Sequence, residues 1–153
     1  MGEGHVKFGF YRGGKVSVPV PLAASQAFKA RSGRFVYLDG SGNAVLADDG
    51  ADEIFGHVEA AEKTYSSTAA IDYVNCNIDP SAVFRIPAAA GTYVKTMRGK
   101  TCDLLIDADG IQGADLSNES ADNILIIVDG DEVNNDWVDV MISQNERAQG
   151  EVV

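Results

Sequence analysis

Basic residues are scarce in this chain of 153 residues, where 12 lysines and arginines stand against 23 aspartates and glutamates, a formal net charge of −11. Nucleic-acid binding depends on lysine and arginine at the phosphates, so this balance counts against DNA or RNA as the main partner. Apolar runs are short as well. None approaches the ~20 residues of a membrane-spanning helix, and no apolar stretch of ~7–15 residues follows the basic N-terminus as a signal peptide requires. We therefore expect neither a nucleic-acid nor a membrane partner.

Histidine and cysteine are also rare, with two of each. Neither His5 nor His57 lies in a metal-ligand spacing, and Cys76 and Cys102 form no CxxC pair, so the sequence predicts no metal site built on them. Both cysteines are expected to be buried thiols of a reducing compartment, and His57 a hydrogen-bonded structural histidine. The chain lacks a G-x-S-x-G elbow and other motifs of a nucleophilic enzyme. We expect no catalytic residue, no metal and no cofactor.

The stretch GFYRGGKVSVPVPL at residues 9–22 looks at first like a phosphate-binding loop, since Gly9, Gly14 and Lys15 have the spacing G-x-x-x-x-G-K. Such a loop works because a helix begins directly after it and aims backbone N–H groups at phosphate. The closely spaced prolines prevent that helix, and Val16 stands where a Ser or Thr should bind Mg²⁺. The sequence therefore indicates an accidental match.

A second stretch, DADGIQGADLSN at 107–118, looks like a calcium-binding loop. Asp107 fits its first position, but Gln112 replaces the required glycine and Asn118 replaces the bidentate glutamate. Turn chemistry explains the aspartates and glycines without a metal. A weak calcium site of another kind, between Asp107 and Asp115, stays open.

Apolar residues alternate with period two along most of the chain, which is typical of strands. We expect about eight short strands separated by turns, including a hairpin at 34–47 and a strand that ends at Pro87. Residues 21–33 fit a short helix and a strand equally well. Many short strands at this spacing predict a mainly β fold, a small single-domain barrel or sandwich.

The N-terminal region differs in charge from the rest. Residues 1–38 carry six basic side chains and one acidic one, whereas the remaining 115 residues carry six basic and 22 acidic ones. Within this region Pro19 and Pro21 leave one edge of an extended segment without N–H donors, while the alternating valines keep donors on the other edge. The segment is therefore either an edge strand of its own domain, protected from aggregation, or an arm that adds a strand to a partner's sheet.

The second interpretation divides the chain into an extended N-terminal arm, residues 1–22, and a β-rich domain, residues 23–153. The residues expected to contact a partner are the apolar ones of the arm. They are Val6, Phe8, Phe10, Val16, Val18, Pro19, Val20, Pro21 and Leu22.

Residues 20–143 resemble the head-decoration, or capsid cement, proteins of tailed bacteriophages. The resembling pieces are DPSAVFRIP, GKTCDL, GIQGADL and ILIIVDGDEVNNDWVDV, with FVYLDGSGNAVLADDGADEIFGHVE upstream. The resemblance implies a compact β-barrel or β-tulip fold without catalytic residues. It also implies homotrimers that bind the major capsid protein on the exterior of the virion, after assembly in the bacterial host cytoplasm, and that stabilise the expanded shell against internal DNA pressure. In related proteins an N-terminal arm clamps neighbouring capsid subunits, which favours the arm interpretation here.

Two other classes stay open. One is a non-enzymatic β-sandwich on a virion that recognises carbohydrate or a receptor; its candidate aromatics are Trp137, Tyr65 and Tyr73, although core packing also explains them. The other is a small trimeric β enzyme that hydrolyses deoxyuridine triphosphate. For that class LIDADGIQG supplies Asp107 and Gly110 without the tyrosine of the motif, which counts against it.

Overall fold

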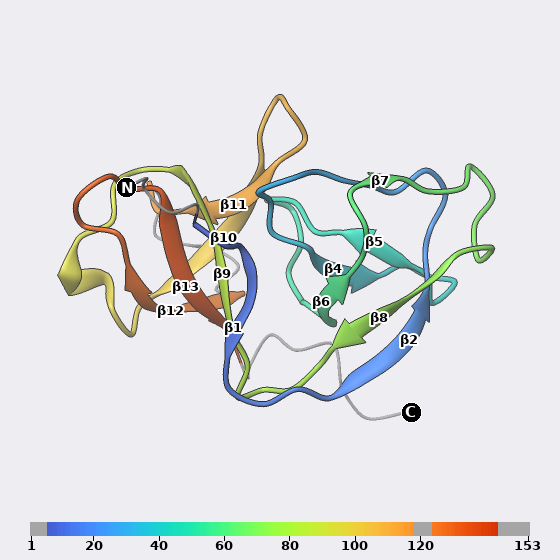
Figure 1. The fold of residues 1–153 in the computed structure, drawn as a ribbon, viewed down its shortest axis with the longest axis horizontal. Helices are drawn as coiled ribbons and strands as arrows, with labels where there is room; N and C mark the ends of the chain where they lie inside the picture. Colours follow the sequence, from blue (N-terminus) through green and yellow to red (C-terminus); the bar gives the residue numbers. More distant parts are fainter. Residues whose placement is uncertain (1–5, 118–123, 144–153) are drawn as a thin grey trace.

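The structure, a computed structural model, describes residues 6–117 and 124–143. Its largest sheet has the strand order β1 (Gly9–Arg12), β9 (Val83–Ala90), β11 (Gln112–Asp115), β10 (Thr101–Ile106), β12 (Leu125–Gly130) and β13 (Trp137–Ile142). Because β13 also pairs with β9, the last five of these strands close into a barrel (Figure 1). Strand β1 lies outside this ring, on the edge of β9.

The second half of the fold is a five-stranded antiparallel sheet. Its order is β2 (Ser17–Pro21), β8 (Tyr73–Asn77), β6 (Gly56–Glu59), β4 (Phe35–Leu38) and β5 (Ala44–Leu46). A bridge between Leu22 and Ala44 brings the ends of β2 and β5 together, so this sheet curls on itself. A separate pair of two-residue strands, β3 (Ala27–Phe28) and β7 (Lys63–Thr64), completes this half, while a short 3-10 helix, Lys95–Met97, belongs to the barrel half.

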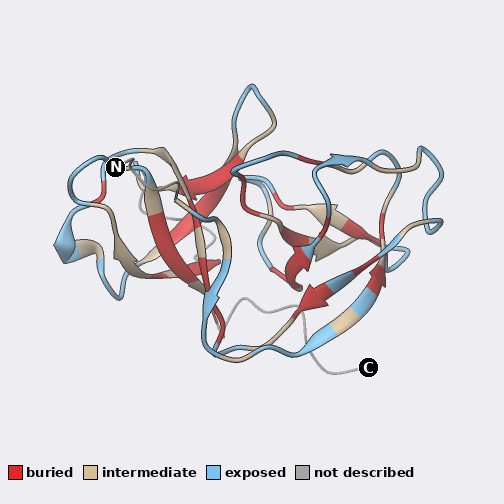
Figure 2. Ribbon diagram, viewed as in Figure 1, coloured by how far each residue is buried: buried red, intermediate tan, exposed pale blue. Residues whose placement is uncertain are grey.

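Two apolar clusters fill the two halves, and buried residues follow the strands of both (Figure 2). The barrel cluster includes Phe84, Leu104 and Leu125, each at most 1% exposed. It also takes in Phe35 from β4, whose ring centroid lies 5.2 Å from that of Phe84. The second cluster contains Leu22. Because Phe35 of the five-stranded sheet packs in the barrel core, the two halves form one small domain, as the sequence predicts.

Among expectations about single elements, one is confirmed, one open alternative is settled and two are wrong. The hairpin at 34–47 is present as β4 and β5, and residues 21–33 contain β3 and no helix. The described residues hold 13 strands instead of about eight, because strands of two to four residues are too short for an alternating pattern to show.

Pro87 does not end its strand, since β9 continues to Ala90. The pairing of β9 with β13 ends at Pro87, and its parallel pairing with β11 begins at Ala88. The missing N–H therefore falls where the ladder changes partner, a position at which proline interrupts a strand least.

Candidate interaction surface

The N-terminal segment, residues 6–22, runs along both halves of the fold. Its strand β1 pairs with the start of β9, and its strand β2 pairs with β8, which precedes β9 in the chain (Figure 1). Both partners belong to the same domain, so in this structure the segment is an edge element of its own fold. Residues 1–5 of the predicted arm, His5 among them, lie outside the described residues, as does Asn118.

Arg85 on β9 fastens β1 to the barrel. Its guanidinium donates to both carboxylate oxygens of Asp139, at 2.7 and 2.9 Å. The same guanidinium carbon lies 4.0 Å from the ring centroid of Tyr11 on β1 and 3.8 Å from that of Trp137. The hydrogen bond to Asp139 raises the pKa of Arg85, so the cation that contacts both rings is permanent.

Gly13 and Gly14 let the segment pass close to the turn before β9. A Cβ on Gly13 would lie 2.2 Å from the backbone oxygen of Ser81, and one on Gly14 would lie 2.1 Å from Oδ2 of Asp79. The Gly14 N–H donates to Ser81 Oγ at 3.0 Å. Close backbone packing thus explains the glycine pair, and a strand instead of a helix follows it. The resemblance to a phosphate-binding loop is accidental, as predicted.

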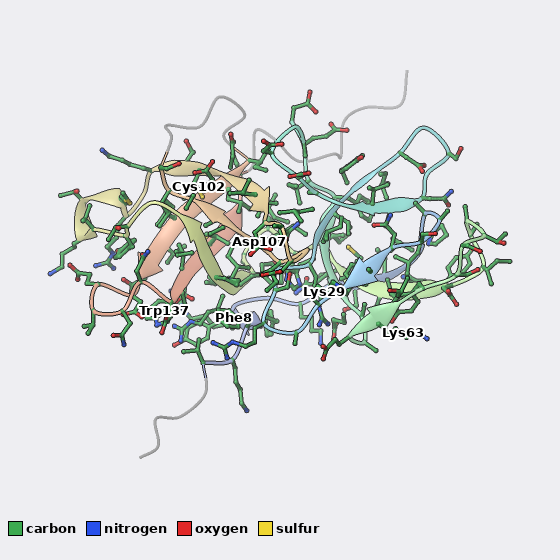
Figure 3. The ribbon with its side chains drawn as sticks, turned by 90° about the horizontal axis from the view of Figure 1, so that it is seen from above. Phe8, Lys29, Lys63, Cys102, Asp107 and Trp137 are labelled. Carbon is green, nitrogen blue, oxygen red and sulfur yellow. The ribbon has the colours of Figure 1, made fainter. Side chains whose placement is uncertain are left out.

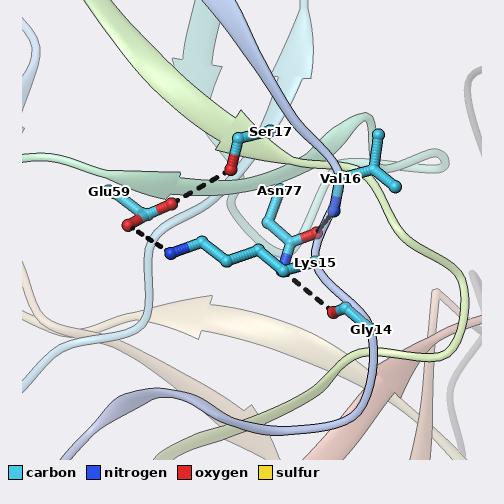
Figure 4. A network of polar contacts seen from close by, with 6 residues as sticks. All are labelled: Gly14, Lys15, Val16, Ser17, Glu59 and Asn77. Atoms are coloured by element: carbon cyan, nitrogen blue, oxygen red, sulfur yellow. Dashed lines mark hydrogen bonds and ion pairs between the residues drawn. The ribbon is translucent and has the colours of Figure 1, made fainter.

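Polar side chains of the five-stranded sheet hold the next residues (Figure 4). Lys15 Nζ lies 2.9 Å from one carboxylate oxygen of Glu59, and Ser17 Oγ donates to the other at 3.2 Å. The buried Asn77 side chain accepts from the Val16 N–H at 3.2 Å and donates to a backbone carbonyl of the segment at 3.4 Å. The exposed ion pair contributes little by itself, so the buried amide is the main anchor.

Pro19 and Pro21 occupy the outer edge of β2. The Leu22 N–H donates to the Asp72 carbonyl on the β8 side at 2.9 Å. Residues two apart in a strand direct their backbone groups the same way, so Val20 shares this direction and the prolines take the positions that face outward. The predicted one-sided pairing is therefore confirmed, with β8 of the same chain as the partner.

The nine predicted partner-binding residues differ widely in exposure. Val20 and Leu22 are buried in the core of the five-stranded sheet, at 5% and 2% exposed, so the intact fold does not offer them to a partner. The other seven residues are at least partly accessible. Four of them are half-buried, namely Val6, Phe8, Val18 and Pro21, and three are exposed, namely Phe10, Val16 and Pro19.

Several exposed apolar side chains lie on or beside this segment. Seven large apolar side chains of the described residues are exposed, and four of them lie here. These four, which we call the exposed apolar group, are Phe10, Tyr11, Val16 and Tyr73, the last being the register partner of Pro21. Sequence reasoning missed Tyr11, whose contact with Arg85 joins residues 74 positions apart and leaves no local signal.

The aromatics expected for a carbohydrate-recognition surface do not come together. Trp137 is on the barrel, whereas Tyr65 packs edge-on against Phe28 and under Lys63 beside the five-stranded sheet. Tyr73 lies on β8, opposite Pro21 of β2. Seen from above, Trp137 and Lys63 lie at opposite sides with Phe8 between them (Figure 3).

His57 lies where the two halves meet, surrounded by aromatic rings. Its ring stacks on Phe84 at a centroid distance of 4.5 Å and meets Phe35 edge-on at 4.8 Å. Its Nε2 accepts a hydrogen bond from the Arg34 N–H at 3.1 Å. Burial, and then the charge of Arg34, lower the pKa of His57 to about 3. The ring is therefore neutral at neutral pH, and the predicted structural role is confirmed.

The loop at residues 107–118, whose sequence looks like a calcium-binding loop, uses the Asp107 carboxylate to accept backbone hydrogen bonds. Asp107 Oδ1 accepts from the N–H groups of Asp109 at 2.8 Å and Ile111 at 3.0 Å, which is the predicted turn chemistry. Within residues 6–117 and 124–143, no three His, Cys, Asp or Glu side chains converge as metal ligands.

Both cysteines are free and buried. Burial raises the pKa of Cys76 and of Cys102 to about 12, so both are neutral thiols at physiological pH. They contribute to the two apolar cores, one to each, as the sequence predicts.

In the part of the chain that the structure describes, no helix has the length and apolar character needed to cross a membrane. Comparison with protein-family models, curated proteins and solved structures found no significant match to this chain.

Proposed function

We propose that this chain is a capsid decoration protein of a tailed bacteriophage. It binds the major capsid protein of expanded shells as a homotrimer on the virion exterior and stabilises them against internal DNA pressure. The resemblance of residues 20–143 to cement proteins supports this proposal, and the small, mainly β domain agrees with it. Cementing needs no chemistry, because a trimer that spans several capsid subunits gains strength from several modest contacts at once.

The observation that carries the proposal is the share of exposed apolar side chains that lie along the N-terminal segment. Four of the seven exposed large apolar side chains lie on or beside this segment, with Val16 at 49% and Tyr73 at 63% exposure. Exposed apolar side chains repeated along one surface segment are a feature that partner binding would explain. Each such side chain contributes up to ~1.5–3 kcal/mol when a partner covers it fully, before the ordering terms are subtracted.

In this proposal the segment binds the capsid while it stays packed on its own domain. Val20 and Leu22 hold it in the core, so detaching it would open the five-stranded sheet. Addition of a partner strand to the outer edge of β2 would lack the donors of Pro19 and Pro21. We therefore assign capsid binding to the outward side chains, with strand addition as the less favoured mode.

The test is co-sedimentation of the chain with expanded, undecorated capsids of its parent particle. Deleting residues 1–22 would remove two core residues and confuse unfolding with lost binding. The double variant Val16→Ser, Tyr73→Ser changes only exposed positions, and Val94→Ser, Val133→Ser is its matched control at exposed apolar positions elsewhere. We expect the native chain to saturate at about one copy per capsid subunit, and the first variant to bind about tenfold more weakly. Equal binding by both variants would show that the N-terminal segment is not part of the interface. No binding by the native chain would refute the proposed capsid-binding function.

A further inference from the structure

A pocket of about 310 Å³ opens between the N-terminal segment and the two halves of the fold. Phe8 and Phe10 line it from the segment, Arg31 and Arg34 from the stretch before β4, and Phe84 from the barrel. Phe8 lies between the two halves when the molecule is seen from above (Figure 3). The pocket thus combines two guanidinium groups with three aromatic rings.

Arg31 has no hydrogen bond or ion pair with any residue that the structure describes. Its guanidinium carbon lies 5.0 Å from the ring centroid of Phe8. Its φ of 54° is in the left-handed region, which is uncommon for a residue other than glycine. Because no acceptor within residues 6–117 and 124–143 bonds to this guanidinium, it can bind an anion through two parallel N–H bonds.

Arg34 is partly used by the backbone and partly unpaired. Its Nη1 donates to the Ala60 carbonyl, and its Nη2 donates to the Lys29 carbonyl at 3.2 Å. Its Nε is buried and has no acceptor within residues 6–117 and 124–143. A buried N–H without an acceptor is destabilising, and because Arg34 also lines the pocket, an anionic oxygen bound there would supply that acceptor.

We propose that this pocket binds a carboxylate carried on a short apolar group. The carboxylate meets the guanidinium of Arg31 and the Nε of Arg34, and the apolar group packs against Phe8, Phe10 and Phe84. The volume lies within the range of small-molecule sites, ~300–1,000 Å³. This inference does not depend on capsid binding.

Glu59 sets the preferred charge of the ligand. Glu59 lines the pocket and its carboxylate is paired with Lys15 at 2.9 Å, so these two charges offset each other. His57, which also lines the pocket, is neutral at neutral pH. A second negative charge on the ligand would face Glu59, so a monoanionic carboxylate is favoured over a dianionic phosphate.

The test is a titration of the full chain with 3-phenylpropanoate, followed through the backbone amide shifts in ¹⁵N–¹H spectra. We expect shifts at Arg31, Arg34 and Phe84 that the neutral 3-phenylpropanamide does not produce. Arg31→Gln should raise the Kd about tenfold or more. Arg12→Gln removes the same charge from an exposed position of β1 outside the pocket lining, and should leave the Kd within about twofold.

Two sources can supply such a carboxylate, a free small molecule or the C-terminus of a peptide. The acetylated peptide Gly-Gly-Phe with a free C-terminus, compared with its amidated form, distinguishes them. Tighter binding of the free-acid peptide than of 3-phenylpropanoate assigns the pocket to a chain terminus, and weaker binding assigns it to a small molecule. Equal binding of acid and amide, tighter binding of phenyl phosphate, or shifts confined to other parts of the chain would overturn the proposal.

Discussion

The side-chain amide of Gln112 satisfies both backbone groups of Phe35. Its Oε1 accepts from the Phe35 N–H at 2.9 Å, and its Nε2 donates to the Phe35 carbonyl at 3.0 Å. The same Nε2 donates to the Ala47 carbonyl at 2.8 Å, and the side chain is fully buried. A residue of β11 therefore acts as the hydrogen-bonding partner of β4, and joins the barrel to the five-stranded sheet.

Replacing Gln112 with alanine should destabilise the whole domain. The change leaves three buried backbone groups with fewer partners and creates a cavity, so we expect the free energy of unfolding to fall by about 3 kcal/mol or more. Urea denaturation followed by Trp137 fluorescence measures it. Gln26→Ala removes a half-buried glutamine that accepts one backbone hydrogen bond, from Leu46, and should lower stability by about 1 kcal/mol. Equal losses in the two variants would contradict the special role of Gln112.

The pH dependence of stability should contain a contribution from His57. Its pKa is about 3 in the folded chain and 6.5 when exposed, so below pH 6.5 the unfolded chain takes up a proton that the folded chain does not. Stability from this group is therefore complete above pH 6.5 and decreases as the pH falls toward 3. The difference in unfolding free energy between the native chain and His57→Gln should shrink by about 2 kcal/mol between about pH 7 and about pH 5. The carboxylates are common to both proteins and cancel. A difference independent of pH would show that the folded chain protonates His57 normally.

The outer prolines of β2 should protect the chain from self-association. Pro19→Val with Pro21→Val restores two N–H donors on an exposed edge, so we expect dimers or larger species in sedimentation velocity at concentrations where the native chain does not change. Pro80→Val is the control, because Pro80 is exposed in a turn outside any strand. Identical sedimentation of the double variant and the native chain would show that the edge needs no such protection.

The close approach at Gly13 can be separated from its backbone conformation. Gly13 and Gly42 both have a positive φ, 95° and 81°, but a Cβ at Gly42 would meet nothing within 4 Å. Both Gly13→Ala and Gly42→Ala suffer the left-handed strain of about 1–2 kcal/mol. Only Gly13→Ala also meets the Ser81 carbonyl, so we expect it to lose about 2 kcal/mol more in thermal or urea unfolding. Similar losses of stability in the two variants would show that the turn before β9 moves away from the new Cβ at little energetic cost.

Local pattern in the sequence determined the fold class and several details. Alternation with period two predicts strands because the side chains of a strand alternate between its faces, and this rule correctly yielded a mainly β single domain and the hairpin at 34–47. The spacing of Pro19 and Pro21 likewise predicts pairing on one side, since proline lacks its N–H wherever it stands. The prolines also excluded a phosphate-binding helix after Gly14.

Only the tertiary structure decided which distant residues meet. Strand β2 pairs with β8 of the same chain. In this arrangement Val20 and Leu22, which the arm interpretation assigns to a partner, are buried. The contact of Gln112 with Phe35 joins positions 77 residues apart, and the pocket brings Phe8 beside two arginines more than 20 positions later. The sequence pattern of a strand shows which of its faces is apolar and that the strand needs a neighbouring strand. It does not specify which strand, because any strand with free N–H and C=O groups can pair with it. The choice among neighbours depends on how whole cores pack, which is a property of the folded chain and not of any stretch within it.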